Sequence, residues 1–199
     1  MKHIFWRELM DEQRIDYLSK YSIVVVGSRM MLEILWRSGI GCIRYVSDFV
    51  SQFDSLTDPT IDPLETNQYD VVNPKSDESC IISYLYPEDR SELRKIMRGA
   101  DMVIAHKHID EIARVAEEIG IPFVPDIVTT FLPDGVKFWE LEYPKVERDP
   151  ISYTLTCGLQ AMEVIKALAG YRPLLAPEAI LVDLKEGIRR VCLRKNGTV

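Results

Sequence analysis

The 199-residue chain lacks several features that mark metal-binding, membrane and nucleic-acid-binding proteins. Its four cysteines form no C-x-x-C pair, which argues against a zinc site and indicates reduced thiols. No apolar run approaches the roughly 20 residues of a membrane span, and no signal-peptide pattern is present. The net charge of −7 argues against a nucleic-acid partner, which usually meets a basic face. We therefore expect a cytoplasmic protein with no membrane and no nucleic-acid partner.

Length and composition are those of one ordinary globular domain. Apolar residues make up 47% and charged residues 28% of the chain, which is typical of soluble proteins with a substantial core. We expect residues 1–199 to form a single domain, beginning with a helix over residues 6–21. Residues 51–79 are rich in proline and aspartate and predict a long loop. This loop is either a solvated segment or a lid over a binding site.

The stretch Ser22–Asp48 has the order strand, turn, helix, turn, strand. Ile23–Val26 is an unbroken β-branched run, as expected for a strand that is covered on both faces. Gly27 marks the turn after it, Met30–Arg37 has the pattern of a helix, and Ile43–Val46 that of a second strand. This order is typical of the first unit of a nucleotide-binding sheet, in which phosphate meets a helix N-terminus.

The usual G-x-G-x-x-G phosphate loop is nevertheless absent, because Ser28, Arg29 and Met30 follow Gly27. Side chains at these positions crowd the backbone that would approach phosphate, although Arg29 offers a cation in compensation. Two interpretations of Gly27 therefore stay open. It belongs either to a nucleotide site or to a plain strand-to-helix turn.

The rest of the chain continues the alternation of strands and helices and then changes to antiparallel signals. The expected elements are strand Cys80–Tyr86, helix Ser91–Arg98, strand Asp101–Ala105, helix Ile109–Ile119, strand Pro122–Asp126, a hairpin around Pro133–Gly135, helix Pro150–Ala169, and strands Ala179–Asp183 and Arg189–Leu193. The predicted fold class is α/β, with a Rossmann-like, mainly parallel sheet flanked by helices and with antiparallel C-terminal strands.

Long segments of the chain resemble the E1-like adenylyltransferase superfamily, which includes the thiamine and molybdopterin sulfur-carrier activators and the ubiquitin-activating enzymes. The matching segments are SIVVVGSRMMLEILWRSGIGCIRYVSDF, ISYLYPEDRSELRKIMRGADMVIAHKHIDE, IGIPFVPDIVTTFLPDGVKFWELE and YTLTCGLQAMEVIKALAGYRPLLAPEAILVDLKEGIRRVCL. The resemblance implies an E1-like fold and an ATP-dependent enzyme that adenylylates a carboxylate.

The resemblance and the expected layout together suggest three groups of site residues. Nucleotide-binding residues would be Gly27, Ser28, Arg29, Ser47 and Asp48; catalytic cations that offset phosphate charge would be Arg90 and Lys107; and substrate-side residues after the fifth parallel strand would be Asp126, Thr129 and Thr130. Each has a plainer interpretation, as a surface charge, a loop cap or a polar turn.

Two departures from the family pattern affect these assignments. Ser47 falls where the family has its ribose-binding acid, with Asp48 one position further along. Ala105 and His108 fall on the positions of the family's two aspartates, so the acid that binds magnesium is missing. ATP is the implied cofactor, whether magnesium takes part is left open, and no metal ligands are assigned. His106 and His108 alone offer too few ligands for a metal site.

The resemblance also suggests partners. Related proteins pair through the C-terminal half, so we expect a homodimer, and the apolar helix face at Leu159, Met162 and Ile165 is either core or dimer contact. The absence of extra domains suggests a small-molecule carboxylate, such as the guanylylpyridinol precursor of the iron hydrogenase cofactor, or a carrier, with a thiol-bearing protein downstream. Two alternatives remain: a catalytically silent E1-like binding or scaffold protein, and a Rossmann-type NAD oxidoreductase.

Overall fold

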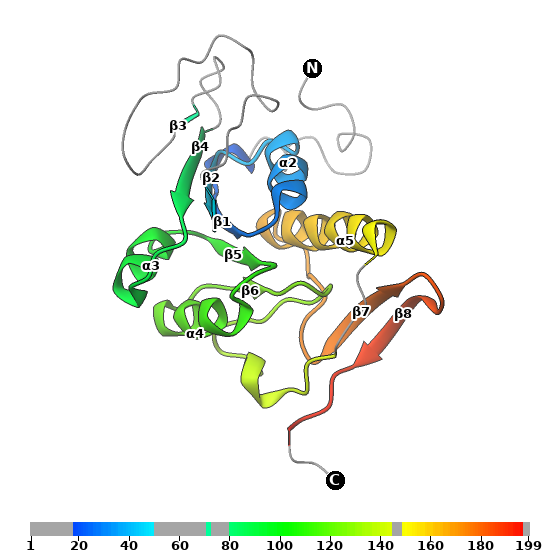
Figure 1. Ribbon diagram of the computed structural model, residues 1–199. Coiled ribbons are helices and arrows are strands. Elements are labelled where there is room, and N and C mark those ends of the chain that lie inside the picture. The colour runs from blue at the N-terminus through cyan, green and yellow to red at the C-terminus, as the bar shows by residue number, and fades with distance from the viewer. Residues whose placement is uncertain (1–17, 50–70, 73–79, 145–148, 197–199) are drawn as a thin grey trace.

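The computed structural model describes residues 18–49, 71–72, 80–144 and 149–196 (Figure 1). The elements are η1 (Leu18–Lys20), β1 (Ser22–Val26), α2 (Arg29–Arg37), β2 (Cys42–Ser47), β3 (Val71–Val72), β4 (Cys80–Leu85), α3 (Arg90–Met97), β5 (Met102–Ala105), α4 (Ile109–Ile119), β6 (Phe123–Val124), η2 (Phe138–Glu140), α5 (Pro150–Leu168), β7 (Glu178–Asp183) and β8 (Gly187–Cys192). None of the described helices is both long enough and apolar enough to span a membrane.

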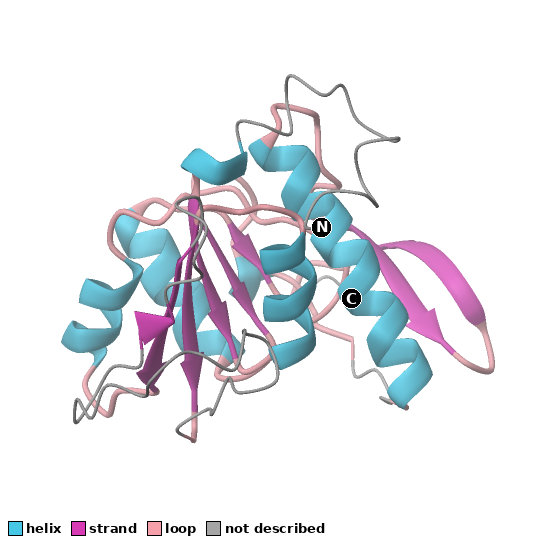
Figure 2. Ribbon diagram, turned by 90° about the horizontal axis from the view of Figure 1, so that it is seen from above, coloured by secondary structure: helices cyan, strands magenta, loops and turns pink. Residues whose placement is uncertain are grey.

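Within the described residues, six strands form one sheet in the order β3-β4-β2-β1-β5-β6. All pairings in it are parallel except that of β3 with β4. β7 and β8 form a separate antiparallel pair that projects beside α5 (Figure 2). The predicted fold class, a mainly parallel sheet with helices and antiparallel C-terminal strands, is confirmed.

Helices cover both faces of the sheet, which explains the unbroken apolar run in β1. Ile23 and Val25 pack on the face covered by α2 and α5, whereas Val24 and Val26 pack on the face covered by α3 and α4. All four side chains are at most 1% exposed. A strand that faced water on one side would alternate apolar and polar residues instead.

One of the expected elements, the hairpin, needs correction. The turn at Pro133–Gly135 exists, but its two arms do not pair as a hairpin. Phe131 instead forms an antiparallel bridge with Phe123, and Phe138 lies in the 3-10 helix η2. These three rings contact one another at centroid distances of 5.5–6.0 Å, so tertiary aromatic packing outweighs local hairpin preference.

Two further expectations, on the N-terminus and the long loop, fall mostly outside the described residues. Of the expected helix over residues 6–21, the structure describes residues 18–21, which contain the 3-10 turn Leu18–Lys20, and residues 6–17 lie outside the described residues. The expected loop over residues 51–79 contains the short strand β3, which pairs with β4, and the rest of it lies outside the described residues.

Candidate functional site

The carboxyl ends of β1 and β5 meet at the place where the strand order reverses. From β1 the chain adds β2 and β4 on one side, and it then crosses over to add β5 and β6 on the other side. In open α/β sheets this reversal creates the crevice where ligands bind. The turns there are held by backbone hydrogen bonds, from Gly27 N to Val46 O at 2.8 Å and from His106 N to Val26 O at 2.9 Å.

Gly27 is required in the turn after β1 for two reasons. Its φ of +75° lies in the left-handed region that favours glycine. In addition, the side chain of Lys107 lies directly over it, because a Cβ added to Gly27 would lie 2.6 Å from Lys107 Cγ. The aliphatic part of Lys107, from the loop after β5, therefore covers the turn in which a phosphate was expected.

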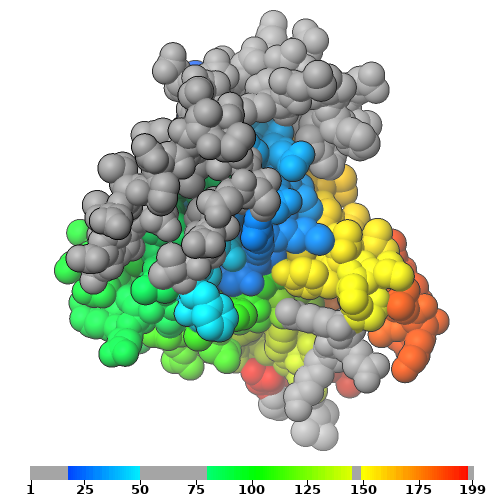
Figure 3. Space-filling view, turned by 45° about the horizontal axis from the view of Figure 1, so that its top comes forward, coloured from blue at the N-terminus to red at the C-terminus, as the bar shows by residue number. Residues whose placement is uncertain are grey.

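The ammonium group of Lys107 is paired with Asp48, the first residue after β2. Lys107 Nζ lies 2.6 Å from Asp48 Oδ2, and His108 Nε2 lies 2.8 Å from Asp48 Oδ1. The hydrogen bond from Lys107, followed by that with His108, lowers the pKa of Asp48 below its usual value. The segment directly after β2, cyan in Figure 3, lies on the surface beside the green middle of the chain.

His108 connects this ion pair to two residues that the sequence did not identify. It has a left-handed backbone, with φ of +52°, and directly precedes α4. Its ring stacks on Tyr86 at a centroid distance of 3.7 Å, and the Tyr86 hydroxyl donates to Glu111 at 2.6 Å. Burial raises the pKa of Tyr86, followed in size by the effect of its bond to Glu111, so this hydroxyl stays protonated. A survey of first residues after parallel strands would have selected Tyr86, which directly follows β4.

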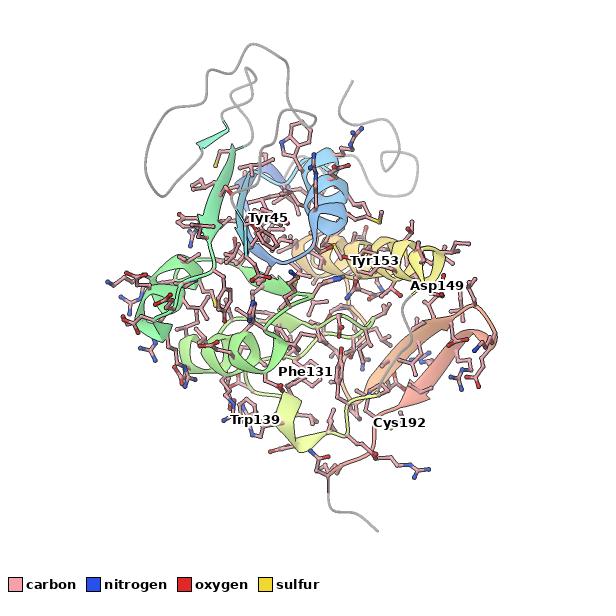
Figure 4. The ribbon with its side chains drawn as sticks, in the orientation of Figure 1. Tyr45, Phe131, Trp139, Asp149, Tyr153 and Cys192 are labelled. Carbon is pink, nitrogen blue, oxygen red and sulfur yellow. The ribbon has the colours of Figure 1, made fainter. Side chains whose placement is uncertain are left out.

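Ser28 and Ser47 lie at the predicted edge but use their hydroxyls internally. Ser28 caps α2, accepts from Met31 N at 3.2 Å and shares a 2.6 Å hydrogen bond with the hydroxyl of Tyr153. Figure 4 shows Tyr153 near the start of α5. The Ser47 hydroxyl donates to the backbone oxygen of Phe49. The acid in the cluster at this edge is therefore Asp48. It lies one position after Ser47, which stands where the family has its ribose-binding acid.

The two predicted arginines lie in different surroundings. Arg29 is the first residue of α2, and its partly exposed side chain pairs with Glu33 at 3.3 Å. Arg90 pairs with Glu118 at 2.5 Å, near the C-terminal end of α4. Glu118 follows His108 by ten positions, which is about 15 Å along a helix at 1.5 Å per residue. The structure thus does not bring the Arg90 guanidinium to Lys107.

The three predicted substrate residues tie the segment after β6 to its neighbours. Asp126 is buried and accepts a hydrogen bond from the hydroxyl of Tyr143. The hydroxyl of Thr129 donates to the backbone of Glu178 at 2.7 Å, and the backbone of Thr130 bridges to Leu175. All three residues are at most 7% exposed, so their side chains are largely withdrawn from solvent.

The residues at this edge do not fit a magnesium ion. Within the described part of the chain, no three His, Cys, Asp or Glu side chains come together where they could hold a metal. The carboxylate of Asp48 has one oxygen on Lys107 and the other on His108. A cation at Asp48 would have to displace both partners.

The architecture is that of the E1-like fold. No protein-family model and no curated protein sequence matches the chain. Among solved structures, it is similar to PaaA (TM-score 0.64, 18% identity, 91% of this chain and 67% of that chain). It is also similar to E. coli MccB with ATP (TM-score 0.65, 17% identity, 93% and 67%) and to MccB with AMPCPP and MccA (TM-score 0.65, 18% identity, 93% and 67%).

Proposed function

We propose that the chain binds ATP at the carboxyl edge of its sheet and transfers the adenylyl group to a carboxylate. The observation that carries the proposal is the cluster of Asp48, Lys107 and His108 at the strand-order reversal of an E1-like fold. A solved protein of the same fold, MccB, is a microcin C7 biosynthetic enzyme with structures that contain ATP. We thus propose for this chain the nucleotide that MccB binds and the reaction class of the E1-like superfamily.

The proposed roles of the residues follow from their charges. Asp48 is the acid that would accept hydrogen bonds from the ribose hydroxyls, and Lys107 is the cation that would face the phosphates. A carboxylate oxygen of the substrate attacks the α-phosphorus, and pyrophosphate leaves with the electrons of the broken P–O bond. Negative charge grows on the phosphoryl oxygens during this step, where Lys107 and Arg29 stabilise it.

Lys107 must first leave Asp48 and uncover Gly27. The Lys107 and Asp48 side chains are 47% and 32% exposed. Ion pairs with such access to water contribute at most about 1 kcal/mol. A micromolar nucleotide supplies about 8 kcal/mol of binding free energy. Opening the pair is therefore a small part of the energy that nucleotide binding releases.

The proposed acceptor is a carboxylate, and a panel of carboxylates is needed to identify which one. MccB has been solved with MccA and with N-formylated MccA, so peptides belong in the test panel. Small carboxylates, including a guanylylpyridinol acid, belong there because the resemblance to the E1-like superfamily implies them. A thiol-bearing protein is the proposed downstream partner, because an acyl-adenylate is open to thiol attack. No step of the proposal is routed through magnesium.

Self-association and location complete the proposal. Ile151 and Leu155, one turn apart on α5, are 58% and 46% exposed, and we propose this helix face as the contact of a homodimer. Ile165 and Leu168 on the same helix are buried in the core. Sedimentation of the full chain tests the dimer. ATP chemistry and reduced cysteines agree with a cytoplasmic location.

Isothermal titration with ATP, in the presence and absence of magnesium, tests the proposal directly. Lys107→Met should weaken ATP binding at least about tenfold, since a charge-assisted hydrogen bond is worth roughly 1.5–3 kcal/mol. Arg29→Ala should weaken it less. Arg90→Ala is the matched control, because its charge is bound to Glu118, and it should bind ATP like the unaltered protein.

Pyrophosphate release with the carboxylate panel then tests the reaction. An unaltered protein that binds no ATP, with or without carboxylates, would refute the proposal and leave the silent scaffold. ATP binding without pyrophosphate release for any carboxylate would retain the nucleotide site and refute the adenylyl transfer.

A further inference from the structure

A pair of thiols lies at the amino-terminal edge of the sheet, at the other end of the strands from Asp48. Cys42 is the first residue of β2, Cys80 is the first residue of β4, and the two are partners in the parallel ladder. The Cys80 thiol donates a hydrogen bond to the sulfur of Cys42 across 2.9 Å. Paired positions of neighbouring strands point to the same face, which places both sulfurs on one side of the sheet.

The backbone around the two thiols is held in place. Cys80 N donates to Gly41 O at 2.6 Å, and Cys42 N donates to Tyr21 O at 3.1 Å. Gly41 has no room to move toward η1, because an added Cβ would lie 1.8 Å from the carbonyl oxygen of Ser19. Neighbouring strands lie about 4.7–4.9 Å apart, inside the roughly 4.4–6.8 Å between the Cα atoms of a disulfide. A bond between the sulfurs therefore needs side-chain rotation and little strand movement.

The surroundings of this pair differ from those of the other two cysteines. Cys42 and Cys80 are half-buried, whereas Cys157 is fully buried and Cys192 lies exposed on β8. The positive charge of Arg44 acts on Cys80 from the same strand face as Cys42. Burial, followed by the bond to Cys42, raises the pKa of Cys80 to about 12. Cys80 is thus the protonated donor of the pair, and the Cys42 sulfur is the acceptor.

We propose that Cys42 and Cys80 are an oxidation site, which a peroxide converts to an intramolecular disulfide between β2 and β4. The Cys42 sulfur attacks one peroxide oxygen, the O–O bond breaks, and a sulfenic acid and one water form. The Cys80 sulfur then attacks the sulfenic sulfur, and the S–O bond breaks. The leaving hydroxide takes the Cys80 proton as a second water. Two thiols lose two electrons in total, and hydrogen peroxide gains them.

The disulfide would join the two strands that lead to the candidate site. β2 ends directly before Asp48, and β4 ends directly before Tyr86. Oxidation would therefore fix the spacing of these strands at one end while the charged cluster lies at the other. The proposal does not depend on ATP or on adenylyl transfer.

Peptide mapping of the full chain tests this site. After treatment with hydrogen peroxide and alkylation of remaining thiols, trypsin should release Cys42 within residues 38–44 and Cys80 within residues 76–90. The expected product is these two peptides joined by one disulfide, formed within a single chain and not between chains, and separated again by dithiothreitol. The double variant Cys157→Ser/Cys192→Ser should give the same product.

Single variants separate the two roles. Cys80→Ser should accumulate a sulfenic acid at Cys42 that dimedone traps, and Cys42→Ser should give much less of it at Cys80 under the same treatment. Circular dichroism establishes that each variant is folded. The main result, the disulfide in the peptide map, comes from the unaltered chain and does not depend on any variant. Separate alkylation of Cys42 and Cys80 after peroxide, or a link from either to Cys192, would overturn the proposal.

Discussion

The two edges of the six-stranded sheet each contain a glycine with no room for a side chain, but the obstacles differ in kind. At the amino edge, the added Cβ of Gly41 would lie 1.8 Å from the backbone oxygen of Ser19. At the carboxyl edge, the added Cβ of Gly27 would lie 2.6 Å from Cγ of Lys107, a side-chain atom. Backbone can yield only if the fold shifts, whereas a side chain can rotate.

This difference separates the part of the sheet that supports the fold from the part that can receive a ligand. The amino edge has backbone hydrogen bonds between η1 and the start of β2, including Gly41 N to Leu18 O at 3.2 Å. The carboxyl edge is closed by the exposed ion pair of Lys107 and Asp48. A closure made from side chains in water opens at little expense of free energy.

Gly41→Ala should have the largest effect, because it tests the rigid edge. The methyl group would push against Ser19 and displace η1, whose Leu18 is 1% exposed in the core. Overpacking of this kind usually destabilises by 1–3 kcal/mol and occasionally more, and we expect about 3 kcal/mol. Thermal unfolding should show a Tm lower by roughly 6–12 °C for a chain of this size.

Gly158→Ala in α5 is the matched control for this change. No atom lies within 4 Å of the Cβ that it would add. Alanine favours the helix over glycine by roughly 0.5–1 kcal/mol, so the control should be neutral or stabilising. Equal Tm values for the two variants would mean that the amino edge is not rigid.

Gly27→Ala should have the second largest effect and should affect both stability and ATP binding. Alanine at a positive φ is strained by about 1–2 kcal/mol. The methyl group would also push Lys107 away from the turn. Gly99→Ala provides the control, since Gly99 has the same φ of +75° but no atom within 4 Å of an added Cβ. We expect Gly27→Ala to be the less stable variant by about 1 kcal/mol, and to lose ATP affinity in titration while Gly99→Ala keeps it.

The central strands and helices were predictable because their residues carry local signals. The run Ile23–Val26 is apolar throughout, since helices cover both faces of the sheet, and α5 begins at Pro150 after the capping Asp149. The segment Pro133–Gly135 shows the limit of such signals. It contains a real turn, but the pairing of Phe131 with Phe123 depends on a contact that local spacing does not encode.

The candidate site was predictable residue by residue but not as a cluster. Asp48 and Lys107 were both selected as residues that follow parallel strands. Their contact depends on β2 and β5 lying on either side of β1, which the order of elements along the chain does not reveal. Tyr86 was missed because the expected strand, Cys80–Tyr86, included it, whereas β4 ends at Leu85. Glu111 was missed because a glutamate on a helix carries no distinctive pattern. Ser28 was selected, but its inward hydrogen bond to Tyr153 comes from α5, far along the chain.

The smallest expected effect is that of removing the charge pair at the carboxyl edge. The lowered pKa of Asp48 means that its contribution to stability is complete above the ordinary pKa of an aspartate, about 3.9. The contribution is lost as pH falls through the lower pKa of the folded state. Because the pair is exposed, Asp48→Asn should destabilise the protein by less than about 1 kcal/mol at pH 7, and the difference should vanish in acid.

Denaturant unfolding of Asp48→Asn at several pH values, with carboxyl NMR titration of the unaltered protein and of Lys107→Met, measures this directly. The pKa of Asp48 should rise in Lys107→Met, because the largest cause of its depression is removed. A loss of several kcal/mol in Asp48→Asn would contradict the distinction between the edges. The ion pair would then be a structural clamp, and opening it would take a large part of the binding free energy of a nucleotide. If side chains alone close the site, Asp48→Asn should lose less than 1 kcal/mol of unfolding free energy and should also bind ATP more weakly.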